Sequence, residues 1–241
     1  IPKRELAMEE SSQKKNVFIT SIQKEIHVLS YGYSDKKVLL CHGWAGRSTQ
    51  LFMIANKLLE KGYMVISFDA PSHGKSTGKT SNLMEYITAI EELNNKFGPF
   101  EAAVGHSFGG MALINTEAKN KIFKSLVTIG SGDTVTKIIQ NFIQNFNLNQ
   151  SFANKMIDHI EKKWKIKLDK YASSFAAKEI TIPTLIVHDV NDGDVDVSCA
   201  INIRQNLHNG YLYITKNLGH TKILRNKTVT NKIVNFIIQN S

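Results

Sequence analysis

Ser107 is the residue whose setting most strongly indicates chemistry. It lies in Gly105-His106-Ser107-Phe108-Gly109, between an apolar run that ends at Val104 and a helical pattern that begins near Gly109. A strand that turns sharply into a helix needs small residues beside the turn, because the strained backbone brings the neighbours of the serine into contact. Such a turn exposes the hydroxyl over a helix N-terminus, whose free N–H groups favour a developing negative charge. The spacing therefore predicts a nucleophilic serine.

A serine hydroxyl is a weak nucleophile until a neighbouring imidazole accepts its proton, so a histidine is also needed. His220 has the required setting, because it follows the last predicted strand and precedes the last predicted helix. Gly219 leaves room at that turn. Two other histidines are expected to be structural, since His188 ends a predicted strand and His208 lies in a helical pattern.

A carboxylate must hold the imidazole in one tautomer and balance the positive charge that it acquires. The loop after the predicted strand 184–188 contains four aspartates, Asp189, Asp192, Asp194 and Asp196. Their positions in the sequence do not indicate which of them is the acid. The histidines lack the spacing of metal ligands such as H-E-x-x-H, so no metal is expected. No other cofactor is expected either.

The elements that must position these residues follow from the alternation of short apolar runs with helical patterns. Strands are predicted at 16–20, 25–31, 38–41, 64–68, the run ending at Val104, 124–129, 184–188 and 211–214, and helices at about 51–59, 80–97, from 109 onwards and 229–237. This alternation indicates an α/β fold with a mostly parallel central sheet and helices on both faces. We expect residues 1–241 to form a single domain.

One segment, about 133–180, interrupts the alternation. Apolar residues recur at helical spacing in two stretches, at Val135, Ile138, Ile139, Phe142, Ile143 and Phe146, and at Phe152, Ile157, Ile160 and Trp164. We expect a helical cap or lid insertion here. Its apolar face is expected to pack onto the domain and also to line a substrate pocket, which Phe142 and Phe146 are large enough to close.

Five motifs in a fixed order extend this interpretation: Cys41–Trp44, Phe68–Ser76, Gly105–Gly110, His188–Asp192 and Gly219–His220. From about residue 25 to its end the chain resembles the α/β-hydrolase family, in which nucleophile, acid and histidine follow in this order. The resemblance implies the α/β-hydrolase fold with a helical cap after the sixth strand.

The resemblance also ranks the remaining candidates. The family motif H-G-x-x-D-x-x-V sets Asp192 in register as the acid, although Asp189 replaces the usual glycine. Some relatives instead carry the acid where this chain has Asp133. The family positions that correspond to His42, His73 and His106 shape turns, so these histidines are expected to be structural.

The resemblance implies a serine hydrolase that cleaves a small ester-like carbonyl substrate through an acyl-enzyme, with Ser107, His220 and Asp192 as catalytic triad. Backbone N–H groups of Trp44 and Phe108 would form the oxyanion hole. The alternatives are an acyltransferase or thioesterase, or a C–C bond hydrolase, using the same triad, and a non-catalytic binding module. Relatives with halide or epoxide chemistry carry aspartate where this chain has the serine, which disfavours that chemistry.

Composition limits the partners. The chain has 30 Lys and Arg against 21 Asp and Glu, a net charge of +9, but no basic run interleaved with aromatics, so nucleic-acid binding is not expected. It has no run of 18 apolar residues, which argues against stable membrane insertion. Two cysteines are too few for a disulfide framework, so we expect a cytoplasmic setting, with export before processing left open. The sequence does not indicate an oligomeric state.

Overall fold

A central sheet with strand order β1-β2-β4-β3-β5-β6-β7-β8 organises the molecule. The computed structural model describes residues 1–241, except for the side chain of Asn145. β2 runs antiparallel to both of its neighbours, whereas the strands from β4 to β8 are parallel. The strands are β1 (Gln13–Ile19), β2 (Lys24–Tyr31), β3 (Lys37–Cys41), β4 (Met64–Phe68), β5 (Phe100–His106), β6 (Phe123–Ile129), β7 (Thr184–Asp189) and β8 (Gly210–Thr215). The predicted fold class is confirmed.

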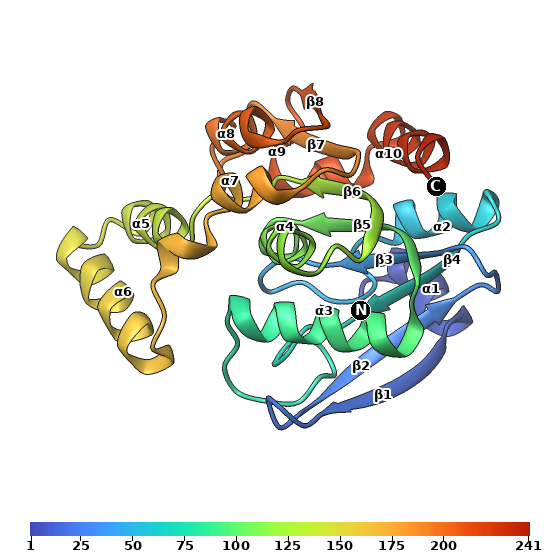
Figure 1. Ribbon diagram of the computed structural model, residues 1–241, viewed down its shortest axis with the longest axis horizontal. Coiled ribbons are helices and arrows are strands. Elements are labelled where there is room, and N and C mark those ends of the chain that lie inside the picture. The colour runs from blue at the N-terminus through green and yellow to red at the C-terminus, as the bar shows by residue number, and fades with distance from the viewer.

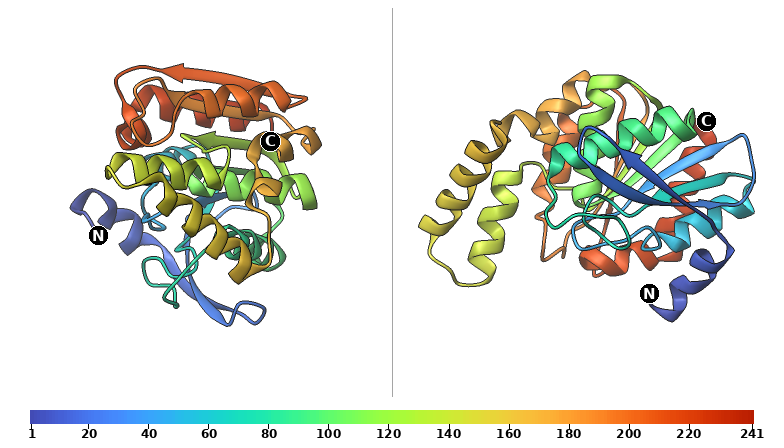
Figure 2. Two further views of the ribbon diagram at one scale, coloured as in Figure 1. Left: turned by 90° about the vertical axis from the view of Figure 1, so that its left-hand side faces the viewer. Right: turned by 90° about the horizontal axis from the view of Figure 1, so that it is seen from below.

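Helices cover both faces of this sheet, because successive side chains of a buried strand point to opposite sides. Leu39 and Cys41 pack in the core beneath α3, α4 and α8, and Val38 and Leu40 pack beneath α2 and α10. Figure 2 shows these two layers on either side of the sheet in its right-hand view. The longer helices of the body are α2 (Phe52–Glu60), α3 (Leu83–Phe97), α4 (Phe108–Asn120), α8 (Ser198–Asn206) and α10 (Lys227–Gln239). Among the described helices, none is both long and apolar enough to cross a membrane.

A helical hairpin leaves the body where β6 ends. It comprises α5 (Val135–Asn145) and α6 (Gln150–Trp164), and it extends beyond the sheet at the left of Figure 1. A separate small core joins its two helices, formed by Ile139, Ile143, Ala153 and Leu168. Short helices then return the chain to the body: the 3₁₀ helix Leu168–Tyr171, α7 (Ser173–Ala176) and the 3₁₀ helix Ala177–Glu179. The amphipathic patterns at 135–146 and 152–164 thus correspond to α5 and α6.

The N-terminal segment adds structure that the sequence patterns did not predict. A 3₁₀ helix (Lys3–Glu5) leads into α1 (Leu6–Ser11). Glu5 is 2% exposed, and its carboxylate accepts two hydrogen bonds from the Arg47 guanidinium, at 2.8 and 3.0 Å, and one from the Thr49 hydroxyl at 2.7 Å. Glu9 pairs with Lys75. These contacts tie the N-terminal segment to the loops that follow β3 and β4.

Candidate active site

Ser107 occupies the turn between β5 and α4. Its φ and ψ are 51° and −120°, and its N–H donates to the carbonyl of Ile129 at 2.9 Å. A Cβ at Gly105 would lie 2.7 Å from the Cα of Gly110, and one at Gly109 would lie 2.4 Å from the carbonyl oxygen of His42. Glycine at both positions is therefore a steric requirement of the turn. Ser107 is partly exposed and follows the carboxyl end of β5, so it lies at the carboxyl edge of the parallel strands.

His220 lies on the short helix α9 (Gly219–Lys222), which follows β8. Its Nδ1 is 2.7 Å from Oδ2 of Asp192, a side chain that is 1% exposed. The other carboxylate oxygen of Asp192 accepts hydrogen bonds from the N–H groups of Asp194 and Val195, each at 2.9 Å. Burial by itself would raise the pKa of Asp192, but the hydrogen bonds outweigh it and hold the pKa below its ordinary value. The carboxylate is therefore ionised and oriented at neutral pH.

Two contacts bring this pair close to the serine turn. Gly130, which follows the residue that accepts the Ser107 N–H, would place a Cβ 3.2 Å from both His220 Nδ1 and Asp192 Oδ2. The rings of His106 and His220 lie 4.6 Å apart, and His106 Nε2 donates to the carbonyl of His220 at 3.0 Å. Among the described residues, no hydrogen bond joins the Ser107 hydroxyl to this imidazole. Catalytic contacts often tighten only when substrate binds.

The other histidines in the motifs have structural contacts. His42 is held between the carbonyl of Gly43, 2.7 Å from Nδ1, and the N–H of Ala70, which donates to Nε2 at 2.9 Å. Burial lowers the pKa of His42 to about 4, and burial together with the neighbouring His220 lowers that of His106 to about 3. Both rings are neutral at physiological pH. Their hydrogen bonds connect the loop after β3 to Ala70 and the end of β5 to His220.

His208 corrects a sequence prediction. The structure places it in the loop after α8, which ends at Asn206, so it is outside the helix that the pattern predicted. Leu207 and the following turn lead directly into β8, and this interrupts the helical pattern. Its Nε2 lies 2.8 Å from the carbonyl of Lys178.

The other aspartates that the sequence left open bond elsewhere. Asp133 accepts a hydrogen bond from the N–H of Ser174 at 2.8 Å, and Asp196 accepts one from the N–H of Ser198 at 2.9 Å. Asp194 is exposed. Within the described residues, Asp192 is the aspartate that hydrogen-bonds to His220. Asp192, Asp194 and His220 also place potential metal ligand atoms within 4.8 Å of one another, but the short Nδ1–Oδ2 contact already engages two of these groups.

The loop after β3 runs beside the serine turn. A Cβ at Gly43 would lie 2.8 Å from the Cβ of Ser107, and the ring of Trp44 meets the ring of Phe108 edge-on, with centroids 5.4 Å apart. Phe108 is the first residue of α4, so its N–H belongs to the helix N-terminus. Of the two residues expected to supply the oxyanion hole, Phe108 thus follows Ser107 at the start of α4, and Trp44 lies on the loop after β3. The Trp44 side chain itself is 58% exposed.

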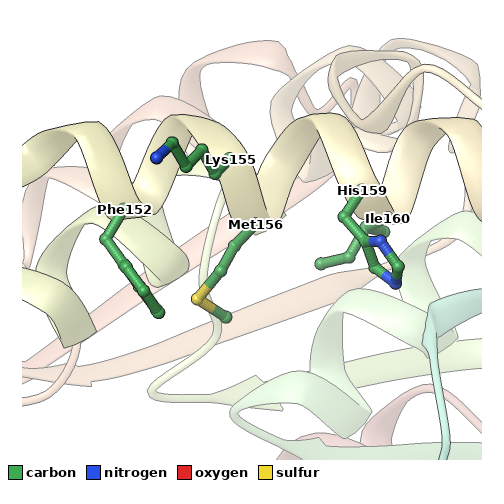
Figure 3. A pocket seen from close by; sticks show the side chains of 5 residues that line it. All are labelled: Phe152, Lys155, Met156, His159 and Ile160. Atoms are coloured by element: carbon green, nitrogen blue, oxygen red, sulfur yellow. The ribbon is translucent and has the colours of Figure 1, made fainter.

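Phe142 and Phe146 are 52% and 63% exposed, and their rings meet in a tilted arrangement with centroids 4.7 Å apart. Ile139 and Ile143 of α5 instead fill the core of the hairpin. A hollow of about 210 Å³ lies along α6 and is lined by Phe152, Lys155, Met156, His159 and Ile160 (Figure 3). Sequence patterns identified only Phe152 and Ile160 of this set. Lys155 and His159 are polar and give no signal in an apolar periodicity, whereas Met156 is apolar at helical spacing and could have been found.

Comparisons with known proteins identify the family and the fold. The family described as alpha/beta hydrolase fold matches residues 36–168. A candidate lipase from Acinetobacter baumannii AYE superposes with a TM-score of 0.74 at 21% identity, over 99% of this chain and 96% of that one. A membrane phospholipase A gives 0.76 at 17% identity, over 99% and 90%. An esterase from Exiguobacterium antarcticum gives 0.72 at 19% identity, over 94% and 100%. A search of curated protein sequences finds no match.

Proposed function

The chain belongs to the α/β-hydrolase family, and from this premise we propose that it is a serine hydrolase that cleaves a small ester-like carbonyl through an acyl-enzyme. The observation that carries the proposal is the 2.7 Å contact between Asp192 and His220 beside a strained serine turn. The lipase, phospholipase and esterase names of the similar structures agree with ester cleavage.

In the proposed mechanism, His220 Nε2 accepts the proton of the Ser107 hydroxyl while the serine oxygen attacks the substrate carbonyl. The N–H groups of Phe108 and Trp44 stabilise the oxyanion that develops on the carbonyl oxygen. Loss of one such donor typically costs about 10²–10³ in rate. The imidazolium then gives its proton to the departing alkoxide, and water, activated by the same imidazole, hydrolyses the acyl-enzyme.

In this mechanism Asp192 sets the tautomer of His220. Because its carboxylate accepts the Nδ1 proton of His220, the imidazole presents an unprotonated Nε2 to the serine. The negative charge also stabilises the imidazolium that forms during attack. A single group thus sets the tautomer and lowers the energy of the charged intermediate.

A labelling experiment tests the proposal. We expect a fluorophosphonate probe to form one covalent adduct at Ser107, located by intact-protein and peptide mass spectrometry. Ser107→Ala should abolish the adduct, and Ser21→Ala, in the turn between β1 and β2, should leave it unchanged. An adduct elsewhere, or none on folded protein, would refute the proposed nucleophile.

Turnover assays then define the substrate class. p-Nitrophenyl esters of rising chain length and matched acyl thioesters, each with and without an added alcohol acceptor, separate esterase, thioesterase and acyltransferase activity. Hydrolysis of esters over thioesters, with no transfer product, is the expected result. A labelled Ser107 without turnover of any substrate in the panel would favour a binding module.

A further inference from the structure

Asp189 is a buried carboxylate at the end of β7, where the family motif has glycine. The side chain is 0% exposed. Its Oδ1 accepts a hydrogen bond from the N–H of Asn191 at 3.0 Å. Its Oδ2 accepts one from the Thr215 hydroxyl at 2.7 Å and one from the N–H of Leu218 at 3.0 Å. One carboxylate therefore joins three points on two different loops.

The two loops are the ones that carry Asp192 and His220. Asn191 immediately precedes Asp192, and Leu218 lies two residues before His220. A second pair of contacts runs in parallel, because Asn191 Oδ1 accepts from the N–H of Asn217 at 3.1 Å and the N–H of Val190 donates to the Thr215 carbonyl at 3.0 Å. The link is thus direct and short in sequence on both sides.

The charge on Asp189 suits this role. Burial alone would raise the pKa of its carboxyl, but the hydrogen bonds from Thr215, Gly219, Leu218 and Asn191 outweigh burial, and the pKa lies below its ordinary value. Bonds from N–H or O–H groups to an ionised acceptor are roughly twice as strong as those to a neutral one. A glycine here would leave the N–H of Leu218 without this acceptor.

We propose that Asp189 is a positioning residue that fixes the loops of Asp192 and His220 in mutual register, so that the Nδ1–Oδ2 hydrogen bond forms in the free protein. The inference rests on the proposed function for its catalytic consequence, but its structural content concerns only the pair. When Asp189 is neutral or absent, the Asn191–Asn217 and Val190–Thr215 contacts still join the two loops, but their mutual register is looser. His220 then spends less time in the tautomer that can accept a proton from Ser107.

The first test is kinetic. Asp189→Asn keeps the size of the side chain but removes the charge and replaces one acceptor with an NH₂ donor, and Asp189→Gly restores the family residue. We expect each to lower kcat by about 10- to 100-fold, which is about 1.4–2.7 kcal/mol of activation free energy, with KM changed less than about threefold. Asp196→Asn is the matched control, because Asp196 bonds Ser198 in the same loop.

The second test reads the pair without turnover. In proton NMR the His220 Nδ1–H that bonds Asp192 gives a far-downfield resonance, assigned by its loss in His220→Gln. We expect Asp189→Asn to weaken or remove this resonance in protein that remains folded, and Asp196→Asn to preserve it.

Each possible result either supports or overturns the positioning role of Asp189. If Asp189→Asn lowers Tm but keeps both the resonance and kcat, the residue is merely structural and the inference is wrong. If wild type retains the resonance but lacks activity, the proposed function fails while the loss of the resonance in Asp189→Asn still supports the inference. If Asp189→Asn does not fold, Thr215→Val, which deletes only the hydroxyl donor, must give a two- to fivefold loss of kcat in the same direction. Wild-type behaviour of Thr215→Val would then overturn it.

Discussion

Substitution of Asp192 by asparagine tests the site most directly, because the structure dictates which way the amide must turn. One oxygen of Asp192 accepts hydrogen bonds from the N–H groups of Asp194 and Val195. If the NH₂ of the introduced asparagine faced them, the N–H groups of the exposed Asp194 and the buried Val195 would both lose their acceptor, and the buried one alone would cost about 1–3 kcal/mol. The amide oxygen therefore stays on those donors, and the NH₂ faces His220 Nδ1.

This orientation places His220 in the wrong tautomer. Nδ1 becomes the acceptor of the amide hydrogen, so the proton moves to Nε2, which can no longer take the proton of Ser107. We expect a loss of kcat of about 10⁴-fold, the scale measured for the equivalent change in another serine hydrolase. A hydrogen bond between neutral groups, worth about 0.5–1.5 kcal/mol, then replaces one to a charged group, worth about 1.5–3 kcal/mol, so the free energy of unfolding should fall by about 1–1.5 kcal/mol.

The assay is the hydrolysis of p-nitrophenyl acetate, with thermal melting on the same preparations. Asp194→Asn and Asp133→Asn serve as controls, because neither side chain contacts His220 among the described hydrogen bonds. Both should retain turnover within a few fold. If Asp133→Asn lost most of its turnover while Asp192→Asn kept nearly normal turnover, the assignment of Asp192 as the acid would be refuted.

Three further predictions concern the surroundings of the site. If Phe142 and Phe146 line the acyl site, alanine at either should shift relative kcat/KM toward longer acyl chains by about 10- to 200-fold, and an unchanged ester profile would contradict this. Since both rings are exposed, Tm should change little. The pKa of His106 is about 3 in the folded chain and about 6.5 when unfolded, so its contribution to stability is complete above about pH 6.5 and is lost as the pH falls toward 3. His106→Gln should therefore flatten the fall of Tm with acid, and an equally steep fall would contradict this assignment. Gly130 has a φ of 58°, and Gly130→Ala would add a methyl group against the Asp192–His220 pair, so turnover should fall at least tenfold. Wild-type kinetics in this variant would show that the pair tolerates the added methyl group.

The sequence predicted the parts of the site that local patterns encode. Gly105 and Gly109 report the steric demand of a sharp turn, and the periodicities of two and 3.6 report the strands and helices around it. The family order placed Asp192 and His220 on neighbouring loops. The 2.7 Å contact between them agrees with that expectation, while their catalytic roles stay predictions.

The parts that the sequence could not supply depend on partners distant in the chain. The role of Asp189 depends on Thr215 and Leu218, which no spacing rule connects to it. The amphipathic pattern of α5 showed that one face would be buried, but did not show that Ile143 would fill the hairpin core while Phe142 lies exposed. Glutamate is usually a surface residue, so the sequence does not indicate that Glu5 is buried. Its burial depends on its contacts with Arg47 and Thr49.

The contacts of Glu5 affect where the N-terminal boundary of an expressed fragment should be placed. The region matched by the family begins at residue 36, so boundaries chosen from the match alone would discard Glu5 together with β1 and β2. Arg47 and Thr49 would then lose their shared carboxylate on the loop that also carries Trp44. A shortened protein with weak activity would be mistaken for a poor enzyme.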